Sequence, residues 1–241
     1  MRLPFLELVR RRVVVLDGAM GSALQQMPLD LHKDWMGHEN ISEVLNFTRP
    51  DVIQQIHESF LAVGCDAVET NTFGANKIVL AEADMADRVF DNNKAAAEIA
   101  RRACQKFETP DSPKYVIGSI GPGTKLVSLQ QTSWDVMEDS YYEQIRGLIA
   151  GGVDALLIET SQDLLQVKCA IAAANRAMAE AGVRLPIMAQ MSMDLNAGQS
   201  MLLGSDSETV VATLSPYDEL DVLGLNCATG PTEHVELVVR A

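Results

Sequence analysis

Several features that define common classes of protein are missing from this 241-residue sequence. It has no run of about 18 apolar residues, so no transmembrane helix is expected. Its first residues lack the apolar stretch and cleavage site of a secretory signal, so the expected location is the cytoplasm. Positive charge is scarce, with 19 lysines and arginines against 33 aspartates and glutamates. Such an acidic surface repels phosphates and anionic lipids, so neither nucleic acid nor membrane is an expected partner.

Cysteine is scarce too, and the 4 cysteines include no C-x-x-C motif and no adjacent pair. A disulfide framework is therefore not expected in a chain of this size and setting. The sequence also lacks a G-x-x-x-x-G-K-[ST] motif, and no G-x-G-x-x-G fingerprint follows the first predicted strand. A nucleotide cofactor is therefore not indicated.

Short apolar runs rich in β-branched residues alternate with longer segments of helical periodicity. The predicted strands are Val13–Leu16, Ala67–Glu69, Tyr115–Ile120, Ala155–Ile158, Ile187–Gln190 and Val222–Leu225. This alternation is typical of an α/β protein with a parallel sheet. For the first long helix we expect Thr48 as the cap and Pro50 in the first turn.

An internal repeat narrows the fold class. Residues 64–70 (GCDAVET) are similar to residues 152–160 (GVDALLIET), each with glycine and aspartate before a strand that ends in Glu-Thr. Repeats of one strand and one helix favour a TIM-type (β/α)8 barrel over an open sheet. About six of the eight units are visible, so we expect an incomplete barrel with exposed edges and a tendency to self-associate.

Polar residues follow the predicted strands, where barrel enzymes place their chemistry. Asp17 precedes a glycine, which suits either an anion-binding turn or a tight structural turn. Glu69 and Glu159 end apolar strands, and such acids either act on a ligand or cap and pair within the protein; we favour Glu159 as functional. Cys227 also ends a strand, and its position permits a nucleophile, a metal ligand or an inert thiol.

The remaining cysteines and the histidines are less informative. Cys65 lies at the opposite end of the barrel, and Cys104 and Cys169 lie on apolar helix faces, where a free cysteine is usually a small core residue. His57 borders an apolar helix face and gives little guidance.

As an ordered set, the strand-end motifs resemble the homocysteine S-methyltransferase family. The matching stretches are residues 17–21 (DGAMG), 69–73 (ETNTF), 121–122 (GP), 157–160 (LIET) and 224–231 (GLNCATGP). Within the family, the chain most resembles the homocysteine-binding module of cobalamin-dependent methionine synthases. The resemblance implies one barrel domain at 8–241, lacking its last two units.

The resemblance also implies a site. In the family, three cysteines hold zinc; Cys227 matches the first, while the adjacent pair that supplies the others has no match here. Glu159 would hold the substrate ammonium, and Asp17 with the backbone at Gly18 and Ala19 would anchor its polar groups. Asn226 would shape the zinc loop.

The implied reaction is zinc-dependent methyl transfer to the thiol of homocysteine, giving methionine. The donor would be methylcobalamin on another domain, alongside folate-binding and reactivation domains. One alternative is the same barrel with betaine or an S-methylated amino acid as donor. Another is a non-catalytic amino-acid-binding barrel or an inactive fragment.

Overall fold

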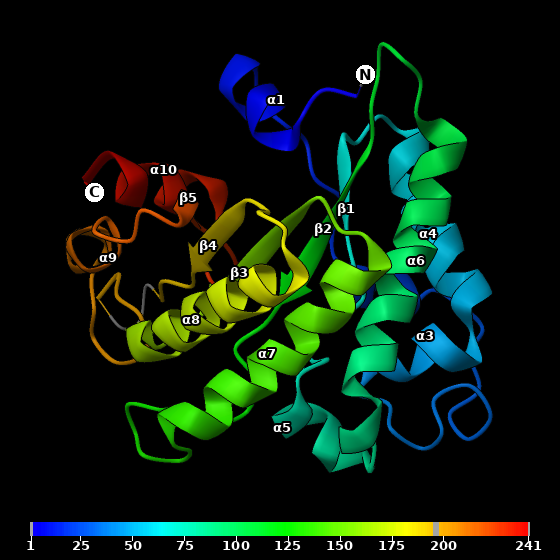
Figure 1. Ribbon diagram of the computed structural model, residues 1–241, viewed down its shortest axis with the longest axis horizontal. Coiled ribbons are helices and arrows are strands. Elements are labelled where there is room, and N and C mark those ends of the chain that lie inside the picture. The colour runs from blue at the N-terminus through cyan, green and yellow to red at the C-terminus, as the bar shows by residue number, and fades with distance from the viewer. Residues whose placement is uncertain (1, 195–197, 241) are drawn as a thin grey trace.

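A computed structural model describes residues 2–194 and 198–240 of the chain (Figure 1). At its centre is a parallel sheet of five strands in the order β1-β2-β3-β4-β5, so neighbours in the sheet are neighbours in sequence. The strands are β1 (Ala67–Glu69), β2 (Tyr115–Ile120), β3 (Ala155–Ser161), β4 (Ile187–Met191) and β5 (Leu220–Leu225). Helices connect every successive pair, as the alternation in the sequence predicts.

The prediction of a strand at Val13–Leu16 is wrong, although this run lies beside β1. Val15 O accepts a hydrogen bond from Asp66 N at 2.8 Å. Two carboxylates then replace backbone acceptors: Asp66 Oδ2 accepts from Val15 N, and Asp17 Oδ1 accepts from Glu69 N, each at 3.0 Å. Side-chain oxygens that bind the backbone in this way compete with a regular strand ladder.

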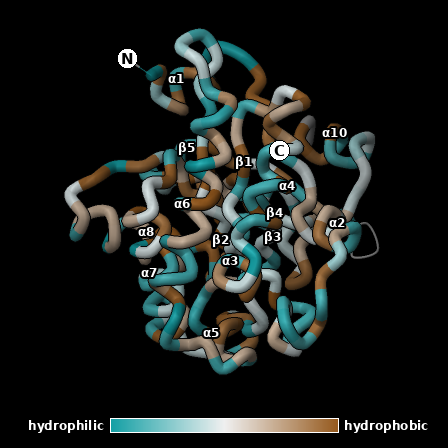
Figure 2. Tube along the Cα trace, turned by 90° about the vertical axis from the view of Figure 1, so that its right-hand side faces the viewer, coloured by the Kyte–Doolittle hydropathy of each residue, from teal (hydrophilic) through white to brown (hydrophobic). Residues whose placement is uncertain are grey.

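The longer helices form the outer layer. They are α4 (Pro50–Ala62), α6 (Val89–Phe107), α7 (Trp134–Gly151), α8 (Leu164–Ala181), α9 (Ser207–Leu214) and α10 (Pro231–Arg240). In Figure 1, α6, α7 and α8 lie side by side across one face of the sheet. Along α7 the residues alternate between hydrophilic and hydrophobic, as expected for a helix with one buried face (Figure 2).

Shorter helices occupy the connections. They are α1 (Phe5–Arg11), α2 (Met20–Leu24), α3 (Leu45–Thr48) and α5 (Lys77–Leu80), with 3-10 turns at Ser42–Val44, Ala81–Ala83 and Ala86–Arg88. None of the helices in the described ranges has the length and hydropathy to cross a bilayer.

The start signals of the helices were predicted with mixed success. Pro50 is the first residue of α4, as expected, but its cap is Arg49 rather than Thr48. Thr48 ends α3 instead, and its hydroxyl donates to Asp34 O at 2.6 Å. At α8, Asp163 accepts a hydrogen bond from Leu165 N at 2.9 Å, which satisfies one free amide of the first turn.

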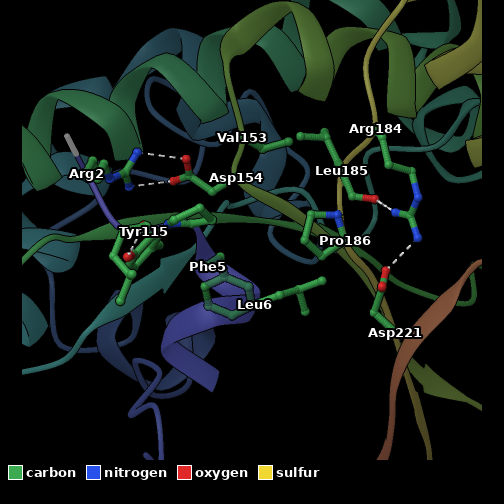
Figure 3. A pocket seen from close by; sticks show the side chains of 12 residues that line it. Arg2, Phe5, Leu6, Tyr115, Val153, Asp154, Arg184, Leu185, Pro186 and Asp221 are labelled. Carbon is green, nitrogen blue, oxygen red and sulfur yellow. Dashed lines mark hydrogen bonds and ion pairs between the residues drawn. The ribbon is translucent and has the colours of Figure 1, made fainter. Parts of the chain in front are cut away.

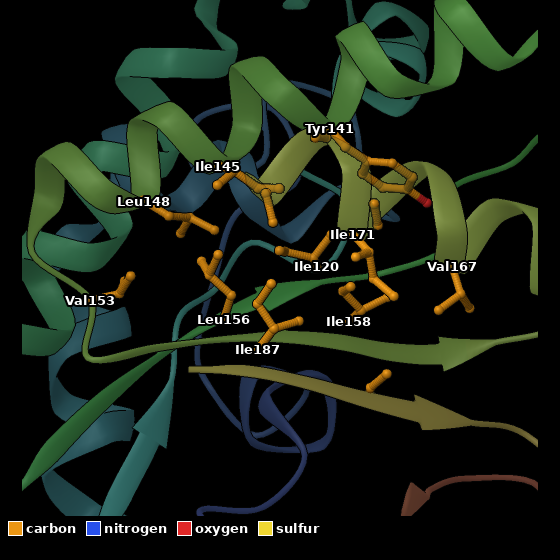
Figure 4. Close-up of a cluster of buried hydrophobic side chains, with 14 of the residues drawn as sticks. Ile120, Tyr141, Ile145, Leu148, Val153, Leu156, Ile158, Val167, Ile171 and Ile187 are labelled. Carbon is orange, nitrogen blue, oxygen red and sulfur yellow. The ribbon is translucent and has the colours of Figure 1, made fainter. Parts of the chain in front are cut away.

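The main hydrophobic core lies between the sheet and the outer helices. Figure 4 shows Leu156 and Ile158 of β3 directed toward Ile145 and Leu148 of α7 and toward Ile171 of α8. All five side chains are at most 3% exposed. Burying each such side chain stabilises the fold by about 1.5–3 kcal/mol.

The inner face of the sheet has its own core, which α1 covers. Phe5 and Leu8 of α1 join a buried cluster with Ile117 and Leu157 from the strands. The ring of Phe5 meets that of Tyr115 edge to face, with centroids 5.4 Å apart. This cluster fills the inside of the sheet at its amino-terminal end.

Beside α1 is a cavity of about 500 Å³, shown in Figure 3. Its charged side chains are paired with one another: Arg2 lies 2.8 Å from Asp154, and Arg184 lies 2.8 Å from Asp221. These pairs fasten the amino-terminal ends of the strands, and their charges are already neutralised. The opposite end of the sheet has a different character.

Candidate functional site

At the carboxyl ends of the strands, the inner face changes from apolar to polar. Leu157 of β3 belongs to the inner cluster, and Glu159 faces the same way because side chains two residues apart share a face. The same rule turns Ser119 of β2 and Glu69 of β1 toward the inside. Three adjacent strands therefore direct polar side chains to one place.

Glu159 lies deep in this region, with 9% of its surface exposed. Its Oε1 accepts a hydrogen bond from Ser119 Oγ at 2.5 Å, and its Oε2 lies 3.5 Å from Asn226 Nδ2. Burial raises the pKa of Glu159, and the nearby carboxylate of Asp17 raises it further. The hydrogen bond from Ser119 opposes both effects because it stabilises the charged form.

Asp17 and Glu69 complete what we call the acidic cluster, defined as Asp17, Glu69 and Glu159. The side chain of Asp17 is 4% exposed, and its Oδ1 is held by Glu69 N. The pKa of Glu69 is raised to about 9, first by burial and then by the charges of Glu159 and Asp17. The three acids therefore repel one another in a region that water reaches poorly.

The acidic cluster has no lysine or arginine partner within the described part of the chain. No lysine or arginine there forms an ion pair with any of its three carboxyl groups. The one basic side chain in range is His57, whose Nδ1 lies 3.8 Å from Asp17 Oδ2. An incoming ammonium group would relieve the repulsion and donate hydrogen bonds to the carboxylates. The arrangement therefore suits a protonated amine.

Asn226 and Cys227 follow β5 and meet the end of β3. Asn226 Oδ1 accepts a hydrogen bond from Thr160 N at 3.0 Å, and its Nδ2 donates to Thr160 Oγ1 at 2.9 Å. The thiol of Cys227 is exposed and lies 3.6 Å from the same Oγ1. Thr160 and Cys227 both have left-handed backbones, with φ of 55° and 58°. Such strain is maintained only where surrounding contacts enforce it.

Gly18 and Ala19 follow Asp17 at the same end and are exposed. A Cβ atom on Gly18 would lie 3.0 Å from Phe60 Cε1, so a larger residue there would push against the ring. The structure thus places all six predicted site residues at one end of the sheet. Ser119 and Thr160 were not predicted as their hydrogen-bond partners. The alternation of side-chain directions along the strand, counted from Ile117, could have predicted that Ser119 faces the site. The positive φ of Thr160 could not have been predicted from the sequence.

The other three cysteines are buried, as predicted for Cys104 and Cys169. Burial raises the pKa of both Cys104 and Cys169 to about 12, so neither forms a thiolate at neutral pH. Cys65 donates to Leu16 O at 3.2 Å. Within the described residues, Cys227 is therefore the one cysteine with an exposed thiol.

The described residues do not complete a zinc site. They include no group of three histidine, cysteine, aspartate or glutamate side chains arranged to hold a metal ion. Cys227 contributes one sulfur, whereas a zinc site with an open position needs three protein ligands.

Comparisons with known proteins agree with this geometry. The family model of homocysteine S-methyltransferase matches residues 14–241. The chain is 45% identical over 231 residues to the methionine synthases of Mycobacterium tuberculosis and Mycobacterium leprae, covering 96% of this chain and 19% of each relative. It therefore spans about a fifth of the length of these curated relatives.

Solved structures confirm the fold. The metallated form of the homocysteine methyltransferase MmuM from Escherichia coli superposes with a TM-score of 0.77 at 19% identity, over 99% of this chain and 82% of that one. The oxidized form gives a TM-score of 0.72 at 21% identity, over 94% and 77%. The predicted α/β class and its barrel architecture are thereby confirmed, with a sheet that stays open between β1 and β5 in the described residues. The chain belongs to the homocysteine S-methyltransferase family.

Proposed function

We propose that the chain binds homocysteine, with the ammonium group in the acidic cluster and the sulfur near Cys227, for methyl transfer that yields methionine. The observation that carries this proposal is the cluster of Asp17, Glu69 and Glu159, which has no lysine or arginine partner among the described residues. Family membership supports the substrate, and the carboxyl groups of Asp17 and Glu159 would supply the negative charge that complements its amino group.

Each oxygen has a role in this proposal. Ser119 holds one oxygen of Glu159, and the other has only a long contact to Asn226, so it can accept an ammonium hydrogen. Glu69 N holds Oδ1 of Asp17, which leaves Oδ2 for the same ammonium or a neighbour. The exposed backbone at Gly18 and Ala19 would bind the remaining polar groups of the amino acid.

We also propose a zinc ion at Cys227. Two further thiolates would have to come from outside this sequence, because the described residues provide one. When bound, zinc would keep the thiol of homocysteine deprotonated at neutral pH. A homocysteine methyltransferase of the same fold has a metallated form, which is consistent with a metal ion here. Asn226 would fix the loop that carries Cys227.

The likeness to methionine synthases supports a role as one module of a larger enzyme. In this proposal, residues 8–241 form the homocysteine domain, methylcobalamin on another domain donates the methyl group, and folate-binding and reactivation domains complete the protein. Ala241 itself lies outside the described residues. Four free cysteines suit a reducing compartment, which supports the cytoplasm as the location.

The test is methionine formation by the complete natural protein with zinc bound. Homocysteine and methylcobalamin are supplied, and betaine or S-methylmethionine replaces methylcobalamin in parallel reactions. The proposal expects methionine from methylcobalamin, a loss on zinc removal and a raised KM for homocysteine in Glu159→Gln. No methionine from any donor at full zinc content would refute methyl transfer, and methionine from betaine alone would refute the cobalamin assignment.

A further inference from the structure

His57 lies behind the acidic cluster, on the side of α4 that faces Asp17. Its side chain is 0% exposed. Neither ring nitrogen has a hydrogen-bond partner within the described ranges of the chain. Buried polar groups in folded proteins are nearly always paired, so an unpaired buried imidazole calls for an explanation.

The geometry connects His57 to one particular oxygen. Its Nδ1 lies 3.8 Å from Asp17 Oδ2, which is too long for a hydrogen bond. The other oxygen of Asp17 already accepts from Glu69 N at 3.0 Å. The carboxylate is therefore fixed on one side, and its second side faces the ring of His57.

Asp17 needs such support because no strand holds it. The preceding run at 13–16 forms no regular ladder with β1. Three residues beyond His57, Phe60 packs against Gly18, with 3.0 Å between its Cε1 and a Cβ built on that glycine. Side chains three apart on a helix share a face, so one face of α4 backs both Asp17 and Gly18.

We propose that His57 is a positioning residue for the amino-acid end of the substrate. In the bound state, Nδ1–H of His57 donates to Asp17 Oδ2 and fixes the carboxylate that faces the ammonium group. Hydrogen bonds in a functional site are often long without ligand and shorten when it binds. His57 touches no reacting atom. The inference rests on the proposed function, because it assumes that Asp17 binds the ammonium of homocysteine.

Three substitutions separate positioning from mere filling of the core. His57→Asn places an amide nitrogen close to where Nδ1 lies, so it keeps the donor. His57→Leu fills similar space without a donor. His57→Gln keeps polarity but carries its amide farther along the side chain, toward the position of Nε2. If His57 only filled space in the core, the homocysteine affinities of the variants would follow how well each side chain packs. If His57 positions Asp17, the affinities follow whether the variant keeps a hydrogen-bond donor near Asp17.

The experiment measures homocysteine affinity by calorimetry in the complete natural protein, with metal content and thermal unfolding checked for each variant. A lost hydrogen bond to a charged group weakens binding by about tenfold or more, so His57→Leu should show this loss. His57→Asn should stay within about threefold of the wild type. In an Asp17→Asn background, adding His57→Leu should cause little further loss, because His57 acts through Asp17.

The possible contradictions are distinct. The inference would be overturned if His57→Leu bound homocysteine as tightly as the wild type, or if His57→Asn and His57→Leu lost affinity equally. If His57→Leu does not fold, His57→Gln decides. It should bind homocysteine more weakly than His57→Asn, and equal or tighter binding would overturn the inference. A wild-type protein that does not bind homocysteine would overturn the proposed function and this inference with it.

Discussion

The substitution Glu69→Gln should stabilise the protein while weakening its site. Glu69 is buried beside Asp17 and Glu159, and its pKa is raised from 4.5 to about 9. Because the folded-state pKa lies above the unfolded value, the folded protein binds one more proton between these two pH values. Wild-type stability therefore falls as pH rises through that window. The glutamine side chain does not titrate, so the variant does not lose stability in this way as pH rises.

The size of the effect follows from the pKa difference. Each pKa unit corresponds to about 1.4 kcal/mol, so the gain from glutamine should reach about 3 kcal/mol at pH 7. It should shrink to about 1 kcal/mol at pH 5 and vanish near pH 4.

Denaturant unfolding of wild type and variant at several pH values measures the gain. Glu98→Gln is a matched control, because Glu98 is an exposed carboxylate on α6 whose loss should change stability by less than about 0.5 kcal/mol at any pH. A difference between wild type and Glu69→Gln that stays constant from pH 4 to pH 8 would refute the reasoning. So would a variant that is less stable than the wild type at pH 7.

Three further predictions follow from the site and the core. Glu159→Gln should weaken homocysteine binding by about tenfold to a hundredfold, measured by calorimetry, and unchanged affinity would contradict its role. Cys227→Ala should abolish zinc uptake by the complete protein in metal analysis, whereas Cys169→Ala should keep its zinc. Gly147→Ala should cost roughly 1–3 kcal/mol in denaturant unfolding, because the new Cβ would lie 2.5 Å from Phe90 O; an equally stable variant would contradict this packing.

Much of the fold follows from patterns that short stretches of sequence carry. The strands at residues 115–120 and 187–191 read as apolar runs, and Pro50 marks a helix start by its own chemistry. The run at 13–16 has the composition of a strand, yet the carboxylates of Asp66 and Asp17 take its backbone partners. That outcome depends on residues some fifty positions apart, so local pattern does not reveal it.

The candidate site, like the fold, could be predicted from the sequence only in part. Its acids and Cys227 were predictable because strand ends converge in a barrel. The hydrogen bond from Ser119 to Glu159 depends on the register between β2 and β3, which no local motif specifies. His57 resembles a border residue of an amphipathic helix, and its contact with Asp17 appears only once α4 packs behind that turn.

The central claim is that the acidic cluster binds the ammonium group of homocysteine. Its most direct test compares the affinities of homocysteine and 4-mercaptobutanoate, which keeps the thiol and carboxylate but lacks the amine, in the complete protein at pH 7. The account predicts that removing the amine weakens binding by about a hundredfold, and that Glu159→Gln narrows this gap to about tenfold or less. Equal affinity of the wild type for the two ligands would contradict the account.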